Sequence, residues 1–179
     1  MVAVTGGHTQ AQAVLDALWE CLLPGVEDAG STSDDEVLAA RLRRLSLAPV
    51  LGSAARERFA KARLDASAEG SALPDGTTVI VDPVDGGWLV RLGPFLNVEV
   101  SQGEWRESSP LGRPVVAAGA WQGDTFVAEL YVITTPHRVR LSVDADAGTA
   151  TATWNNVPLT SPSLVLHVRS PLMTRPDVA

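Results

Sequence analysis

Hydrophobic and polar residues alternate along most of the chain that follows Thr77. A period of two residues is typical of β-strands that place one face on a core and the other in water. Turn-forming pairs such as Gly86-Gly87 and Gly93-Pro94 separate the runs. The pattern predicts roughly eight strands in a meander that forms a barrel, a half-barrel or a curved sheet. The apolar positions of the runs are Val79 and Val81; Trp88, Val90 and Leu92; Leu96, Val98 and Val100; Phe126, Ala128, Leu130 and Val132; Val139, Leu141 and Val143; and Leu164, Leu166 and Val168.

The chain before these runs follows a helical period instead. Apolar residues on one face predict a first helix, which Thr9 and Gln12 begin with the spacing of a capping box. The same spacing recurs at Ser33 and predicts a second helix. A third helix is predicted over residues 53–68, and a short strand over 2–5. The apolar positions of the first two helices are Ala11, Val14, Leu15, Leu18, Trp19 and Leu22, and then Val37, Leu38, Leu42 and Leu45.

Together these patterns predict an α+β fold class. N-terminal helices would precede an antiparallel meander of about eight strands, arranged as a barrel or half-barrel. The predicted organisation is a helical connector over residues 31–70, an antiparallel β domain over 71–170 and a tail over 171–179.

Composition narrows the classes of function. Apolar residues make up 45% of the 179 residues and charged residues 20%, which is typical of a globular protein. A net charge of −7 argues against nucleic-acid binding, which needs a basic face. The sequence contains no apolar run of transmembrane length, and its single cysteine fits a reducing compartment. We therefore expect a cytoplasmic protein that binds no membrane, with Cys21 as a small buried residue of the first helix.

Motifs for catalysis or metal binding are missing from the sequence. None of the three histidines stands at a metal-ligand spacing from another histidine or cysteine. His167 is expected to face solvent on the last strand, and His137 to pack or cap against a turn. The segment 144–148 is expected to be a hairpin turn, because it lacks the distal ligands of a calcium loop. The sequence thus predicts no catalytic residue, no metal and no cofactor.

The tryptophans leave two interpretations open. Trp19 lies on the apolar stripe of the first helix and is expected in the core. Trp88, Trp121 and Trp154 stand at strand ends, where they could plug the mouth of a barrel. Core packing is the favoured interpretation, and the alternative is a ligand pocket that these three residues line together with Tyr131.

Two segments of the β region resemble the C-terminal domain of some bacterial serine hydrolases of the β-lactamase and penicillin-binding-protein-like superfamily. They are residues 119–141 (GAWQGDTFVAELYVITTPHRVRL) and 154–159 (WNNVPL). Residues 2–7 (VAVTGG) and 14–24 (VLDALWECLLP) look like the last strand and terminal helix of the hydrolase domain itself. The resemblance implies that residues 1–30 are a remnant of that domain. It also implies that the β domain is a lipocalin-like barrel or half-barrel and packs on a catalytic domain.

The catalytic motifs of this superfamily do not occur in the chain. The only lysine is Lys61, and no serine precedes it by three positions, so the Ser-x-x-Lys motif is missing. The only tyrosine, Tyr131, is not followed by asparagine two residues later, and Thr9 is not followed by glycine. No catalytic residue can be carried over from the resemblance.

The predicted function is therefore a non-catalytic accessory domain. Its expected partner is a hydrolase catalytic domain or a second copy of the chain, bound through residues 1–24. A carrier of small apolar ligands, with the three strand-end tryptophans at its mouth, is the alternative. A hydrolase in its own right is the third and weakest possibility.

Overall fold

The computed structural model describes residues 11–22, 32–42, 47–53 and 58–172. The chain divides into two compact units, Met1–Ala48 and Pro49–Ala179. Each unit is described by itself below.

The first unit contains the two helical segments that the sequence predicts. Helix α1 spans Ala11–Ala17 and continues into a π-helical turn, η1, over Leu18–Leu22; α3 spans Thr32–Leu42. The expectation of a buried Trp19 and a buried Cys21 is wrong, because Trp19 is 68% exposed and Cys21 is also exposed. Their short helix offers only a narrow apolar stripe, which does not enclose an indole ring. The strand predicted over 2–5 and the capping residue Thr9 lie outside the described residues.

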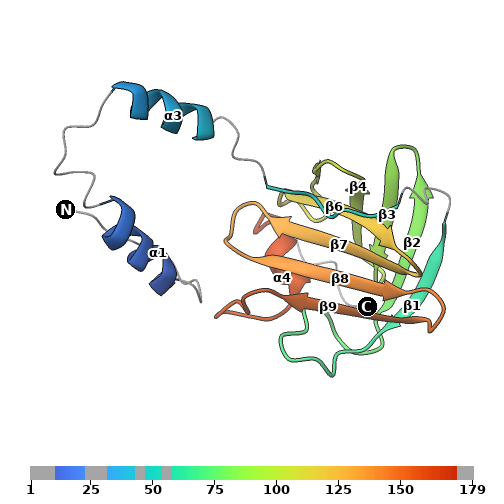
Figure 1. Cartoon of the computed structure of the whole chain (residues 1–179). Coiled ribbons are helices and arrows are strands. Elements are labelled where there is room, and N and C mark those ends of the chain that lie inside the picture. Colours follow the sequence, from blue (N-terminus) through green and yellow to red (C-terminus); the bar gives the residue numbers. More distant parts are fainter. Residues whose placement is uncertain (1–10, 23–31, 43–46, 54–57, 173–179) are drawn as a thin grey trace. The chain divides into compact units, whose positions relative to one another are not determined.

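The second unit is a closed β-barrel with one additional strand, which confirms the predicted fold class (Figure 1). The sheet order is β4-β3-β2-β1-β9-β8-β7-β6-β5, and a further pairing of β4 with β6 closes it. The strands are β1 (Ala60–Leu64), β2 (Thr78–Val84), β3 (Gly87–Leu92), β4 (Leu96–Ser101), β5 (Arg106–Ser108), β6 (Val115–Gln122), β7 (Thr125–Val132), β8 (Arg138–Asp144) and β9 (Thr149–Trp154).

Most neighbouring strands pair antiparallel, as the meander predicts, but two pairings are parallel. One joins β1 to β9, with Leu64 opposite Ala150, and the other joins β4 to β6, with Ser101 opposite Ala118. Both pairings are needed to close the sheet. The pairing of β1 with β9 joins the first strand to the last, and the pairing of β4 with β6 joins one end of the sheet order to the strand next to the other end.

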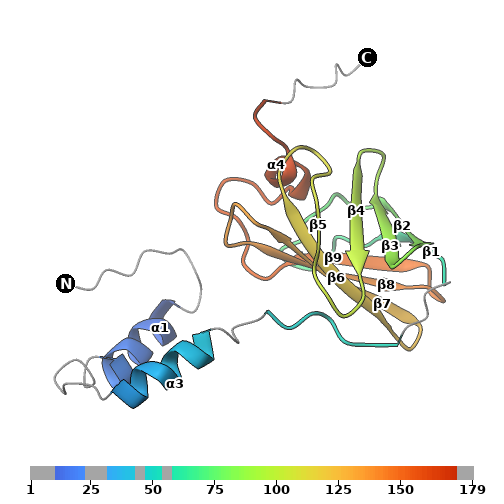
Figure 2. The ribbon, with the colours of Figure 1, turned by 90° about the horizontal axis from the view of Figure 1, so that it is seen from above.

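The edge of β6 that faces away from β7 is shared by three segments. Strand β5 pairs with its first residues and β4 reaches it at Ala118; Figure 2 labels these three strands. Ser53 forms a bridge with Trp121. We call residues 49–53 the strap. The Ser53 amide donates to the Trp121 carbonyl over 2.8 Å, and the Gln122 side chain donates to the Leu51 carbonyl over 2.9 Å. A side chain at Gly52 would collide with the Trp121 carbonyl, so glycine permits this close approach.

The interior of the barrel is filled with side chains. Trp88, Trp121 and Phe126 are fully buried at one end, where both indole rings pack edge-on against the phenyl ring at 5.1 and 5.5 Å. An eight-stranded barrel has an interior just wide enough for side chains to fill. The alternation predicted for β2, β3, β4, β7 and β8 is confirmed, because their apolar positions all belong to this core.

Two predicted elements are wrong. The third helix, predicted over 53–68, is replaced by β1, in which Ala60, Ala62 and Leu64 face the core. Alanine occurs at buried positions of helices and of strands, so the sequence fits both periods. The pairing of β1 with β2 and β9 overrides the helical preference of the alanines.

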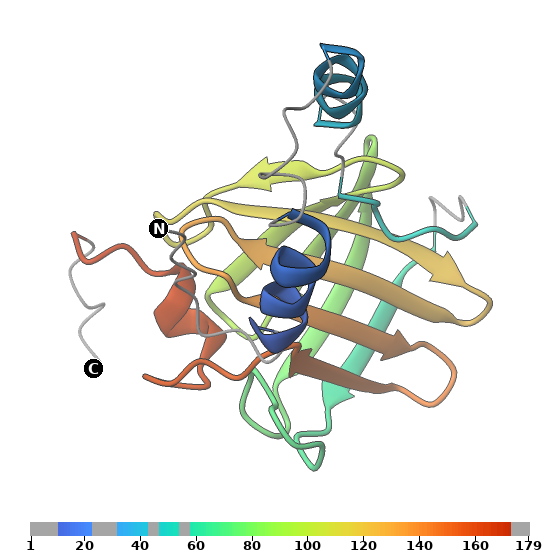
Figure 3. The ribbon, with the colours of Figure 1, turned by 60° about the vertical axis from the view of Figure 1, so that its left-hand side comes forward.

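The last predicted strand is instead the short helix α4, Leu164–Val168. Its buried residues, Leu164 and Val168, are four positions apart, whereas Leu166 is 56% exposed. A run of five residues satisfies a period of two and a helical period equally well, so periodicity alone could not decide. Helix α4 packs at one end of the barrel, and Figure 3 shows it there from a second direction.

The filled interior makes a prediction about stability. Phe126→Ala should lower the free energy of unfolding by about 3–5 kcal/mol, because it leaves a cavity between two indole rings. Phe95→Ala is the control, since Phe95 is 65% exposed, and it should change stability by less than about 0.5 kcal/mol. Urea unfolding measures the free energy of unfolding of both variants. Equal losses of stability in Phe126→Ala and Phe95→Ala would contradict a filled interior.

Candidate functional site

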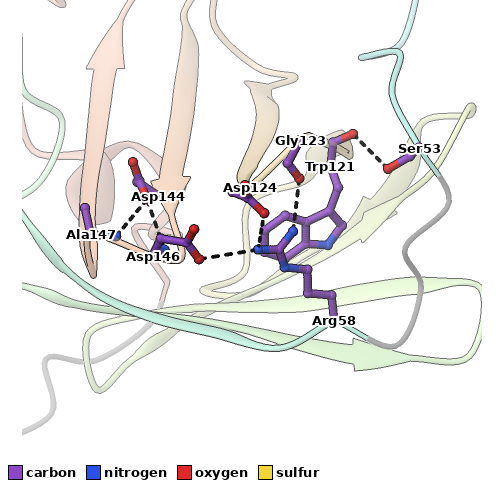
Figure 4. A network of polar contacts seen from close by, with 8 residues as sticks. All are labelled: Ser53, Arg58, Trp121, Gly123, Asp124, Asp144, Asp146 and Ala147. Carbon is purple, nitrogen blue, oxygen red and sulfur yellow. Dashed lines mark hydrogen bonds and ion pairs between the residues drawn. The ribbon is translucent and has the colours of Figure 1, made fainter.

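Arg58 covers Trp121 at the end of the barrel that carries the β6–β7 and β8–β9 turns (Figure 4). We call this end the strap end. The guanidinium lies 4.4 Å from the centre of the Trp121 ring and donates to the Gly123 carbonyl over 3.0 Å. It also pairs with Asp124 at 2.8 Å and with Asp146 at 3.8 Å. One side chain thus joins both turns above a buried indole.

Asp144 shapes the second of these turns. Its carboxylate accepts from the backbone amides of Asp146 and Ala147 over 3.0 and 2.8 Å, a local bond that favours a tight turn (Figure 4). The segment 144–148 is therefore the predicted hairpin turn, and it places Asp146 toward Arg58.

The indole nitrogens of Trp88 and Trp121 are buried near the strap end, and neither has an acceptor within the described part of the chain. A buried N–H without a partner costs about 1–3 kcal/mol. These two groups are therefore polar sites that an acceptor inside the barrel could satisfy.

A second cluster lies on the outer wall of β7 and β8 and is joined by Trp105, which directly precedes β5. We call it the outer patch: Trp105, Glu129, Tyr131, Arg138 and Arg140. Glu129 is opposite Arg140, and Tyr131 opposite Arg138, in the strand register. The Glu129 carboxylate accepts from Arg138 over 3.1 Å and from Arg140 over 3.4 Å. Arg138 also donates to the Tyr131 hydroxyl over 3.2 Å, and the Trp105 ring meets the Tyr131 ring edge-on at 5.2 Å.

The charge of Arg138 is stabilised within this patch. Partial burial acts to lower the pKa of Arg138, but the hydrogen bond with Tyr131 and the charge of Glu129 together outweigh burial and raise it. Arg138 is therefore a permanent positive charge that is held in one position.

A third cluster lies at the end of the barrel that α4 covers. The rings of His137, Trp154 and His167 pack on one another with centroids 5.3–5.9 Å apart. Each ring donates to a backbone carbonyl of the loop that follows β9: His137 Nδ1 to Asn156 over 3.2 Å, His167 Nε2 to Ser161 over 2.8 Å, and Trp154 Nε1 to Pro162 over 2.6 Å. We call these three residues the ring cluster.

A surface pocket of about 220 Å³ lies beside the ring cluster. It shares Pro162 with the loop that the ring cluster holds, and no side chain in its lining is titratable. The lining residues are Ser71, Ala72, Leu73, Pro74, Pro162 and Ser163.

The structure separates the four residues that the sequence suggested for a ligand pocket. Trp88 and Trp121 lie near the strap end, Trp154 lies in the ring cluster, and Tyr131 is on the outer wall. All three tryptophans belong to the core. Whether any of the four binds a ligand remains a prediction.

The predictions for His137 and His167 can be compared with their positions in the barrel. His137 is expected to pack or cap against the turn; its backbone amide donates to the Thr135 hydroxyl over 3.3 Å, while its ring packs on Trp154 and His167. The expectation of a solvent-facing His167 on a strand is wrong, because His167 is partly buried on α4. Sequence reasoning also missed Arg58 and Glu129, whose partners are fixed by strand register and cannot be identified from spacing.

The hydrogen bonds of the His137 and His167 rings are made to backbone carbonyls. Within the described ranges, neither histidine ring is bonded to a hydroxyl or thiol, so no activated nucleophile of the serine–histidine kind is assembled there. The same residues contain no group of three or more histidine, cysteine or acidic side chains that could hold a metal ion. No helix of this part of the chain has the length and apolarity to cross a membrane.

No protein-family model, curated protein or solved structure matches this chain.

The cover over Trp121 can be tested directly. Arg58→Ala should lower the free energy of unfolding by about 1 kcal/mol, because it removes a cation–π contact and an exposed ion pair. Acrylamide should then quench tryptophan fluorescence more strongly. Lys61→Ala, a charge change on the exposed face of β1, is the control. Identical quenching in the two variants would show that Arg58 does not cover the indole.

Proposed function

We propose that this chain is a non-catalytic interaction module whose contact surface is the outer patch. The observation that carries the proposal is the gathering of Trp105, Tyr131 and Arg138 on one wall of a rigid barrel. Tryptophan, tyrosine and arginine are the residues most enriched among those that dominate binding energy at protein interfaces.

The outer patch is held in place before any partner binds. Glu129 is only 13% exposed and fixes Arg138 and Arg140 from below, while the side chain of Arg140 remains 54% exposed. Side chains that are ordered in advance lose less conformational entropy on association. Two arginines on a chain of net charge −7 also favour a partner with an acidic surface.

The proposed partner is a second copy of this chain or the catalytic domain of a serine hydrolase. The hydrolase is supported by the sequence resemblance of residues 119–141 and 154–159, which include all of β7 and parts of β6 and β8. The second copy is supported by charge, since an acidic chain that carries a basic patch is complementary to itself. Apolar residues of the segment 1–24 would contribute further contact area.

Light scattering over a range of protein concentrations tests this function. Wild-type protein should associate reversibly, and Trp105→Ala combined with Arg138→Ala should weaken association at least about tenfold, as expected when interface anchors are lost. Arg63→Ala is the matched control, because Arg63 is an exposed arginine on β1. A wild-type monomer at millimolar concentration would contradict self-association.

The non-catalytic part of the proposal has its own assay. Neither nitrocefin nor p-nitrophenyl esters should be hydrolysed, and a fluorophosphonate should not label any serine, because the Ser-x-x-Lys motif is missing. Stoichiometric labelling would overturn it.

A carrier of small amphiphilic ligands is the second candidate. It is favoured by the two indole N–H groups that lack an acceptor near the strap end. A ligand with a carboxylate or carbonyl could satisfy both groups if Arg58 moved aside. The filled interior opposes this candidate, since no ligand can enter without displacing Phe126 or its neighbours.

Fatty-acid titration separates the carrier from the interaction module. A carrier should show a saturable change in tryptophan fluorescence that Trp88→Phe and Trp121→Phe reduce, and Trp105→Phe should leave the change intact as the control. We expect no saturable response from a filled barrel, and a response that depends on Trp88 and Trp121 would favour the carrier instead.

A further inference from the structure

We propose that His137 and His167 bind one divalent ion of a late first-row transition metal. Copper(II) is the ion expected to bind most tightly, and zinc(II) is the second ion considered. The site lies at the α4 end of the barrel, where His137 directly precedes Arg138 of the outer patch.

The hydrogen bonds of the two rings identify which nitrogen of each neutral ring carries the proton. A backbone carbonyl only accepts, so His137 carries its proton on Nδ1 and His167 carries its proton on Nε2. In the neutral form this leaves a lone pair on Nε2 of His137 and on Nδ1 of His167. Histidines that ligate metals characteristically donate their other N–H to a carbonyl or a carboxylate. Both rings already make this supporting bond.

The separation of the rings is short enough for a shared ion. The ring centroids of His137 and His167 are 5.8 Å apart, with 68° between the planes. A metal–nitrogen bond is about 2.1 Å long, so two imidazoles on one ion have centroids no more than roughly 6.4 Å apart. The observed distance lies within this limit.

The fold holds both rings in place without help from a metal. The loop that follows β9 accepts one hydrogen bond from each histidine, and Trp154 packs against both rings at 5.3 and 5.9 Å. Arg113 also donates to the His167 carbonyl over 3.3 Å, which anchors α4. Both rings are therefore ordered before any ion binds, which lowers the entropic cost of binding.

The donor set selects the kind of ion. Imidazole nitrogen suits copper, nickel and zinc, whereas calcium and magnesium require oxygen ligands. Since the described residues offer no third protein ligand, water would complete the coordination. Among divalent ions at a site of this kind copper(II) binds most tightly.

Calorimetric titration with copper(II) and with zinc(II) tests the proposal on the full chain. Wild-type protein should bind one ion, and His137→Asn and His167→Gln should each weaken binding by more than about tenfold. These two substitutions keep an amide N–H where each ring donates, so the loop stays anchored while the lone pair is lost. His8→Ala, which removes the remaining histidine of the chain, should leave the affinity unchanged.

Copper(II) quenching of tryptophan fluorescence gives a second readout. Trp154 packs against both histidines, so bound copper should quench it, and Trp154→Phe should remove most of the quenching without removing the heat of binding. The absence of saturable binding in the wild-type protein at millimolar metal would overturn the proposal. Equal affinity in the His137→Asn and His167→Gln variants, or loss of affinity in His8→Ala, would do the same.

Discussion

Closure of the sheet along β6 is the constraint on which the rest of this structure depends. A strand that pairs on only one side exposes a row of hydrogen-bonding groups, and a barrel avoids this by joining its ends. Here no single strand covers the second edge of β6. Strand β5, the end of β4 and the strap each cover part of it, and the tight approach at Gly52 brings the strap onto Trp121. The closed sheet then fixes which side chains face inward.

The inward faces leave little space for a ligand, which moves the candidate chemistry to the outside of the barrel. Trp88, Trp121 and Phe126 fill the strap end, and α4 covers the other end with Leu164 and Val168. Outward-facing positions of β7 and β8 carry the outer patch, whose order comes from cross-strand pairing. The same rigid wall thus supports a proposed protein contact, and the α4 end supports a proposed metal site.

The core was predictable where strands alternate over long runs, as in β7, where Phe126, Leu130 and Val132 all face inward. It was not predictable where the residues suit two periods. β1 could not be predicted because its alanines suit a helix as well as a strand. α4 could not be predicted because five residues are too few to distinguish a helical period from that of a strand. The candidate sites depend on contacts between distant segments, such as Arg58 with Asp146 or His137 with His167, and no local spacing encodes them. The parallel pairing of β1 with β9 also joins distant segments, and it could not be identified from the sequence for the same reason.

Exchange of the indole N–H protons with deuterium, followed by NMR, tests most directly the claim that the barrel is closed and filled. Single Trp→Phe variants assign the signals of the five tryptophans. The signals of Trp88 and Trp121 should persist for hours in D₂O, because both nitrogens are buried, while the signal of Trp19, which is 68% exposed, should vanish at once. Exchange of Trp88 and Trp121 as fast as that of Trp19 would show that water reaches the interior and would contradict the account.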